Sequence, residues 1–414
     1  MVTQTVDFGL DAGAKRYRLG AHRTVSPEAT LARVAPFMSE MGITRIANVT
    51  GLDSLGIPVV MACRPNSRSI SVSQGKGIEL AAAKASALME AVETYHAERI
   101  TLPLKLASHD ELSRSHALVD VARLPRSVDS RYRTGLPLLW IEGRNLVDHT
   151  SLWVPHELVH TNYTLPQPTG SGCFPANTNG LASGNHILEA IAHAMYEVVE
   201  RDALTLWWLK PNPRRDRSLR LESIDDLACR KLLEQFARAD VQVRIWDVTS
   251  DVGIACFFCL LMARDDDDVE PEFGSGCHPA RQVALLRALT EAAQARTTYI
   301  AGSRDDFAPE IYSDSARVRR TSACRELVRR GSSGQGFQDV PTFESDTIGA
   351  DIAWSIGRLR EVGIDQVVVV DLTLEQFHIP VVRVLIPGLE GVYKGSHSDY
   401  VPGPRARAVL ESTR

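Results

Sequence analysis

The chain has 414 residues, of which 44% are apolar and 23% charged, a balance typical of a globular protein with a sizeable core. A formal net charge of −5 gives no general attraction for nucleic acid or anionic lipid, so neither is an expected partner. No apolar run approaches the roughly 18 residues of a membrane span. The N-terminus lacks the basic start and apolar core of a signal peptide, so we expect a cytoplasmic protein with no membrane attachment.

The first half of the chain predicts three helices, one of them short, and two short strands before a strand pair. Ser26 is a typical N-cap and Pro27 suits the first helical position, so a helix is expected from there to about Met41. Ser108 and Glu111 have the spacing of a capping box at the start of a short helix. The other expected elements are strands at 45–49 and 58–64, a long helix at 78–100, and strands at 138–145 and 151–155 joined by a turn at 147–149.

The second half predicts two further long helices and four strands. The helices are expected at about 187–209 and 279–301, and the strands at 241–247, 254–262, 366–371 and 381–385. Cys256 and Cys259 lie in the apolar run GIACFFCLLMAR, which favours a buried strand over a metal site. The mixture of helices and non-alternating strands predicts an α/β or α+β fold, with mixed sheets covered by helices, in one domain over residues 1–414.

The long helices carry their polar side chains on one face. In the first, Ser86, Glu90 and Glu93 follow the spacing i, i+4, i+7, which places them on the same side among small and apolar neighbours. The same kind of spacing recurs on the two later helices, at Glu189, His193, Glu197, Glu200, Arg287, Glu291 and Gln294.

Two interpretations of these stripes stay open on physical grounds. Each ExxE pair could simply face water. Alternatively, the carboxylates converge in a partly buried site and need cations to offset their desolvation, for which Mg²⁺ with bound phosphate is well suited. His193 could be a catalytic base, although a hydrogen-bonded core histidine is the more common case.

Phosphate binding would also need donors. Lys76 lies between Gly75 and Gly77 just before the first ExxE helix, where backbone N–H groups and a lysine could hold phosphate; taken alone, the GKG segment favours a tight turn. The upstream glycine and downstream hydroxyl of a P-loop are missing. Arg201 follows Glu200 directly and could pair with it or with phosphate.

Four spaced blocks resemble the YcaO superfamily in sequence order. They read GKGIELAAAKASALMEAVE, NGLASGNHILEAIAHAMYEVVERDA, ALLRALTEAAQAR and IPVVRVLIPGLE, and the resemblance extends from about Arg16 to Glu390. The N-terminal segments YRLGAHRTVSPEAT and GITRIANVTGLDSLGIPVVMACRPN are most similar to the subgroup associated with TfuA proteins. The resemblance implies the YcaO fold, with ATP and Mg²⁺ as cofactors in a site without a P-loop.

Carried over position by position, the resemblance assigns two sets of residues and no catalytic residue. The metal-associated positions are Glu90, Glu93, Glu197 and Glu200. The nucleotide-contacting positions are Arg23, Thr30, Ser86, Asn185, Glu189, Arg201 and Arg287. Some members carry a lysine where this chain has Leu80–Ala83, and Lys76 or Lys84 is the expected substitute.

Members of the family phosphorylate a backbone amide oxygen, after which a nucleophile displaces phosphate. A neighbouring Cys, Ser or Thr gives an azoline, external sulfur gives a thioamide, and an amine gives an amidine. Azoline-forming members end in a PxPxP tail, whereas this chain ends VPGPRARAVLESTR, and no fused peptide-recognition domain is evident ahead of the matched region.

We therefore expect thioamide formation on a ribosomally synthesised peptide or a protein, by a homodimer with a TfuA-like partner and a sulfur donor. The alternatives are an azoline-forming cyclodehydratase, an amidine-forming enzyme, and a scaffold that has lost turnover. The presence of all the metal-associated glutamates is evidence against the scaffold.

Overall fold

The structure is a computed structural model that describes residues 13–210, 218–263, 270–329, 334–391 and 400–412. Its helices are α1 (Pro27–Val34), α2 (Leu80–Ala97), α3 (His109–Leu112), α4 (Ile187–Leu209), α5 (Leu227–Arg238), α6 (Arg281–Ala301), α7 (Asp314–Arg329), α8 (Ile348–Glu361) and α9 (Pro404–Glu411). Its strands are β1 (Arg45–Asn48), β2 (Val59–Cys63), β3 (Val72–Lys76), β4 (Leu104–Ala107), β5 (Arg126–Ser127), β6 (Leu138–Asn145), β7 (Ser151–Pro155), β8 (Leu181–Ser183), β9 (Val241–Asp247), β10 (Cys256–Ala263), β11 (Glu272–Cys277), β12 (Val368–Asp371), β13 (Val381–Leu385) and β14 (Tyr400–Val401).

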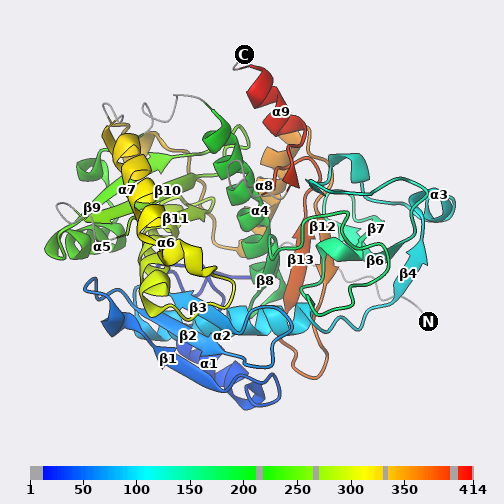
Figure 1. Cartoon of the computed structure of the whole chain (residues 1–414), viewed down its shortest axis with the longest axis horizontal. Helices are drawn as coiled ribbons and strands as arrows, with labels where there is room; N and C mark the ends of the chain where they lie inside the picture. The colour runs from blue at the N-terminus through cyan, green and yellow to red at the C-terminus, as the bar shows by residue number, and fades with distance from the viewer. Residues whose placement is uncertain (1–12, 211–217, 264–269, 330–333, 392–399, 413–414) are drawn as a thin grey trace.

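Each of the three long helices packs against a different sheet. Helix α2 packs on the sheet β1-β2-β3, α6 on the sheet β11-β10-β9, and α4 on β13 and β8 of the six-stranded sheet β4-β6-β12-β13-β8, in which β7 pairs with β6. Figure 1 shows α4 running through the middle of the molecule, with β9–β11 on one side, β12 and β13 on the other, and α2 crossing below. Helices α2, α4 and α6 therefore approach one another at the centre.

The predicted fold class, with sheets covered by helices, is confirmed. The sheets themselves are not mixed, because every strand pairing within the described ranges is antiparallel. Of the two classes that the sequence allowed, the architecture is therefore α+β.

Most predicted elements are present, and one is shorter than expected. The predicted strand pair is β6 and β7, and Ser108 and Glu111 form the capping box. Helix α1 ends at Val34 instead of Met41 and continues only as a 3₁₀ turn over Ala35–Phe37. The reason is Pro36, which has no N–H to donate and whose ring clashes with the preceding helical turn.

The GKG segment is a strand end, which corrects its prediction as a turn or helix start. Lys76 is the last residue of β3 and pairs with Val59 of β2. Gly75 in this strand lies directly under α2, because a Cβ there would be 2.1 Å from the carbonyl oxygen of Ala83. Only glycine permits this approach, which brings the carboxylates of α2 close to the strand.

The core extends around α4. Leu188, Ile191 and Met195 of this helix are fully buried, and Glu189 and Glu200 of its polar stripe are buried as well. Cys256 and Cys259 are fully buried in β10, which confirms the predicted buried strand. Among the described residues, no helix combines the length and the apolar character needed to cross a bilayer.

Candidate functional site

A cavity of about 420 Å³ is lined by side chains of α2, α4 and α6 together with the N-terminal segment. All the residues that the resemblance assigned to metal or nucleotide binding line this cavity, namely Arg23, Thr30, Lys76, Ser86, Glu90, Glu93, Asn185, Glu189, Glu197, Glu200, Arg201 and Arg287. Lys84, the other lysine considered as a phosphate contact, is not part of the lining. The polar stripes therefore converge, and the water-facing interpretation of the ExxE pairs is wrong.

The two carboxylates of α2 are held by neutral donors. Glu93 Oε1 accepts hydrogen bonds from the backbone N–H and the hydroxyl of Ser183, and Glu90 Oε2 accepts one from the backbone N–H of Gln74 at 3.2 Å. Burial raises the pKa of Glu90 to about 7. Burial and the neighbouring charge of Glu90 raise the pKa of Glu93 to about 8. A cation bound here would restore the charged form of both groups.

The two carboxylates of α4 share one arginine. Arg201 lies 3.3 Å from an oxygen of Glu200 and 3.6 Å from an oxygen of Glu197. Glu200 also accepts a hydrogen bond from the hydroxyl of Ser275 at 2.7 Å. Burial raises the pKa of Glu197, with Arg201 opposing this shift and Glu200 adding to it. Arg201 therefore forms the ion pair that the sequence allowed, and it still faces the cavity.

A polar network surrounds the first turn of α4. Glu189 accepts hydrogen bonds from the hydroxyl of Thr24 at 2.6 Å and from the backbone N–H of Asn185 at 2.8 Å. The Asn185 side-chain amide donates to the hydroxyl of Thr30 at 2.9 Å. Its Oδ1 atom is buried without a partner among the residues that the structure describes. This orphaned acceptor at the cavity is where a polar ligand would complete the network.

Arg287 and His193 contact each other across the cavity lining. Arg287 Nη2 lies 3.1 Å from His193 Nε2, while Arg287 Nε is buried without a partner in the described part of the chain. Burial, with Arg287, Arg23 and Lys76 nearby, holds the pKa of His193 well below its usual range. A neutral imidazole that accepts from a guanidinium supports the hydrogen-bonded histidine over the catalytic base.

Glu291 is a cavity residue to which the sequence assigned no role. It forms an ion pair with Lys76, so this lysine already has a carboxylate partner. Burial alone would raise the pKa of Glu291, but Lys76, Arg201 and Arg287 together lower it to about 2. Its place in the stripe between Arg287 and Gln294 was the available signal. Ser183 and Ser275, which donate hydrogen bonds to Glu93 and Glu200, had no signal in the sequence, because each lies in a short strand without a recognisable motif.

The donor set fits Mg²⁺ with bound phosphate. Hard carboxylate oxygens face one cavity, and those of Glu90, Glu93 and Glu197 have raised pKa values that an added cation would reverse. Arg23 and Arg287 are guanidinium groups in the same lining, and guanidinium is a strong phosphate donor.

Comparisons with known proteins point to one family. Residues 74–390 match a family model described as YcaO cyclodehydratase, ATP- and Mg²⁺-binding. An uncharacterized protein in the tfuA 3′ region of Rhizobium leguminosarum bv. trifolii is 38% identical, covering 91% of this chain and 90% of the relative. An uncharacterized protein of Methanothermobacter thermautotrophicus is 35% identical, covering 89% of this chain and 95% of the relative.

Solved structures show the same fold. A heterocyclase in complex with substrate and cofactor superimposes with a TM-score of 0.73 at 24% identity over 91% of this chain, which spans about half (53%) of that longer protein. The YcaO protein of Methanopyrus kandleri, bound with AMPPCP and Mg²⁺, superimposes with a TM-score of 0.72 at 23% identity, covering 91% of this chain and 95% of that chain. The chain thus belongs to the YcaO family, with ATP and Mg²⁺ as its cofactors.

Proposed function

We propose that this protein converts a backbone amide of a peptide or protein into a thioamide at the expense of ATP. In the first step the amide oxygen bonds to the terminal phosphorus of ATP, and ADP leaves. In the second step sulfide (HS⁻) from the sulfur donor adds at the amide carbon, the C–O bond breaks with release of phosphate, and the sulfide proton moves to the amide nitrogen to leave the thioamide. Phosphorylation in the first step converts the amide oxygen from a poor leaving group into a good one.

The observation that carries the proposal is the convergence of carboxylates and guanidinium groups in one cavity. When bound, Mg·ATP supplies the phosphoryl group and neutralises charge on its oxygens. Glu90, Glu93, Glu197 and Glu200 would hold the metal ions, since their oxygens line the cavity from two facing helices. Arg287, which has a free buried N–H within the described residues, would contact phosphate oxygens as charge shifts toward the leaving group.

Two observations favour sulfur as the nucleophile. The Rhizobium relative is named for its position in the tfuA 3′ region, which supports a TfuA-like partner that helps deliver sulfur. In addition, α9 packs against α4 through Arg405 and Asp202, and residues 400–412 do not line the cavity of about 420 Å³ that contains Glu90, Glu93, Glu197 and Glu200, called the glutamate cavity from here on. In azoline-forming members a proline-rich tail contributes to the site, a contribution that the described residues 400–412 do not make.

The second candidate is an azoline-forming cyclodehydratase, which the superposition with the heterocyclase favours. Product mass separates the two. The chain would be co-expressed with a TfuA-like protein and with candidate precursor peptides encoded beside it, and the peptides analysed by mass spectrometry. Exchange of oxygen for sulfur increases the mass, whereas loss of water decreases it, and Glu197→Gln should prevent either change.

Two results would count against thioamide formation. A peptide product that has lost water would show that the protein is a cyclodehydratase. If the peptide stays unmodified and Mg²⁺-dependent ATP binding is absent, with or without the partner, the protein is a scaffold that has the fold of the family but no activity.

A further inference from the structure

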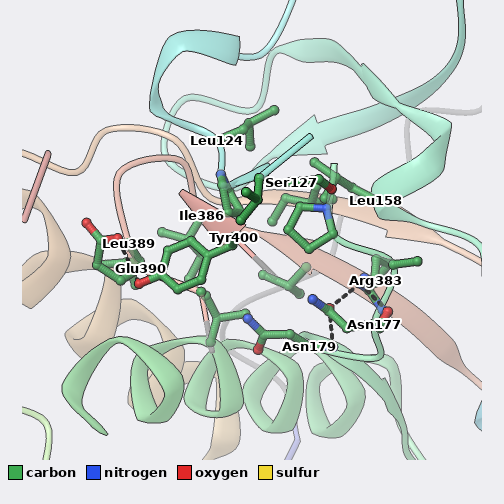
Figure 2. A pocket seen from close by; sticks show the side chains of 18 of the residues that line it. Leu124, Ser127, Leu158, Asn177, Asn179, Arg383, Ile386, Leu389, Glu390 and Tyr400 are labelled. Carbon is green, nitrogen blue, oxygen red and sulfur yellow. Dashed lines mark hydrogen bonds between the residues drawn. The ribbon is translucent and has the colours of Figure 1, made fainter. Parts of the chain in front are cut away.

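A second cavity, of about 700 Å³, has no lining residue in common with the glutamate cavity (Figure 2). It is formed by the segments 124–129, 175–179 and 383–391, together with Leu158, Val198 and Tyr400. Much of its lining is apolar, and Figure 2 shows Leu124, Leu158, Ile386 and Leu389 around it. Its volume lies within the range of sites for small ligands, about 300–1,000 Å³.

The two cavities share one wall. On α4, Val198 lines the second cavity while Glu197 lines the first. In the segment before β8, Asn177 and Asn179 line the second cavity while Thr178 between them lines the first. The two cavities therefore adjoin at these two segments.

Unsatisfied polar atoms mark the wall. Arg383 of β13 is 2% exposed, and its Nη2 donates to the carbonyl oxygen of Asn177 at 2.9 Å. Its Nε and Nη1 are buried without any partner among the described residues, and the same holds for Oδ1 of Asn179. Burial lowers the pKa of Arg383 to about 10, with Tyr163 and Glu197 opposing this shift. Such groups cost free energy unless a ligand satisfies them.

The pattern of atoms selects the chemistry of the ligand. Two N–H donors and one carbonyl acceptor complement a peptide backbone, whose carbonyl accepts and whose N–H donates. The apolar walls suit aliphatic side chains. A free anion is disfavoured, because Asp129 and Glu390 line the cavity and Glu197 lies close to Arg383.

We propose that the second cavity binds the segment of the substrate peptide that flanks the modified amide, with Arg383 and Asn179 holding its backbone and the apolar walls selecting aliphatic side chains. The purpose of this binding rests on the proposed function, since it would present an amide to the adjacent site. Binding of the peptide itself can be measured without turnover.

The test uses fluorescence anisotropy with two capped, fluorescein-labelled probes, Gly-Leu-Val-Leu-Gly and Gly-Asp-Val-Asp-Gly, with and without Mg²⁺ and AMPPCP. The protein would be compared with Arg383→Met and with Val128→Trp, which fills the cavity from a lining position that is 60% exposed and so tolerates substitution. The matched control is Val318→Trp on α7, also 60% exposed and outside the cavity. Calorimetry with Mg·AMPPCP measures the nucleotide site separately.

We expect the dissociation constant of the apolar probe to be about ten-fold or more below that of the acidic probe. Both cavity variants should raise the dissociation constant of the apolar probe by about ten-fold or more. Val318→Trp should bind as the unmodified protein does. Equal affinity for both probes, no binding of either, or unchanged affinity in Val128→Trp would overturn the proposal. If the apolar probe binds in the cavity but Mg·AMPPCP does not bind at all, the proposed function fails and the cavity assignment stands.

Discussion

Ser183 donates both its backbone N–H and its hydroxyl to the same carboxylate oxygen of Glu93, each at 2.8 Å. These bonds attach α2 to β8 and hold the carboxylate at the cavity. Neither donor is charged, so burial and the proximity of Glu90 still raise the pKa of Glu93 to about 8. The group is thus placed to exchange a proton for a divalent cation near neutral pH.

The raised pKa values of Glu90 and Glu93 predict that the ligand-free protein loses stability as pH rises. The folded protein retains protons on these two carboxyls that the unfolded chain releases. Their contribution to the free energy of unfolding is therefore complete below pH 4.5 and is lost as the pH rises through about 7 for Glu90 and about 8 for Glu93. Between pH 6 and 9, unfolding in urea should show a loss of roughly 1–3 kcal/mol, and the loss should be smaller in Glu93→Gln, in which only Glu90 of this pair still titrates. Saturating Mg·ATP should flatten the profile; identical pH slopes in the two proteins would contradict the assignment.

Glu197→Gln is predicted to weaken Mg²⁺-dependent ATP binding by about ten-fold or more, because one charged oxygen ligand is removed from the cation. Isothermal calorimetry measures this directly. The control is Glu375→Gln at an exposed position outside both cavities, which should bind normally. Mg·ATP at about one hundred times its dissociation constant should also raise the free energy of unfolding by about 2.7 kcal/mol, and a chelator should abolish this gain.

Removing Lys76 should destabilise the protein through Glu291. The side chains of this ion pair are 18% and 27% exposed, so Lys76→Met leaves a largely buried carboxylate with less compensation. We expect a cost of about 1–3 kcal/mol in chemical denaturation, below that of a fully buried pair. The double variant Lys76→Met with Glu291→Gln should recover part of this loss, because the orphaned charge is gone. Additive costs in the double-mutant cycle would show that the two residues are not coupled.

The contact between α9 and α4 is predicted to depend on Arg405. Its Nε and Nη2 each lie 3.0 Å from an oxygen of Asp202, whose side chain is fully buried. Arg405→Leu should cost about 2–4 kcal/mol of unfolding free energy, since it leaves a buried carboxylate without its cation. Arg407→Leu on the exposed side of the same helix is the control and should cost less than about 0.5 kcal/mol.

Local sequence signals were sufficient where the interaction that makes the structure is itself local. The spacing of Glu90 and Glu93, and of Glu197 and Glu200, indicated helical faces because helix geometry repeats over a few residues. The ends of α4 and the capping box at Ser108 were predicted for the same reason. The helix predicted to Met41 is too long, because Pro36 breaks it after Val34.

The sequence by itself therefore determined the three long helices α2, α4 and α6, which of their side chains share a face, and which family the chain resembles, whereas α5, α7, α8 and α9 were not predicted. The tertiary structure decided what those faces contact, because pairing between distant strands has no local signature. Ser183 reaches Glu93 only through β8, and Lys76 reaches Glu291 only because β3 lies beside α6. The second cavity likewise forms from segments far apart in the chain, and its unsatisfied Arg383 becomes visible only once they fold together.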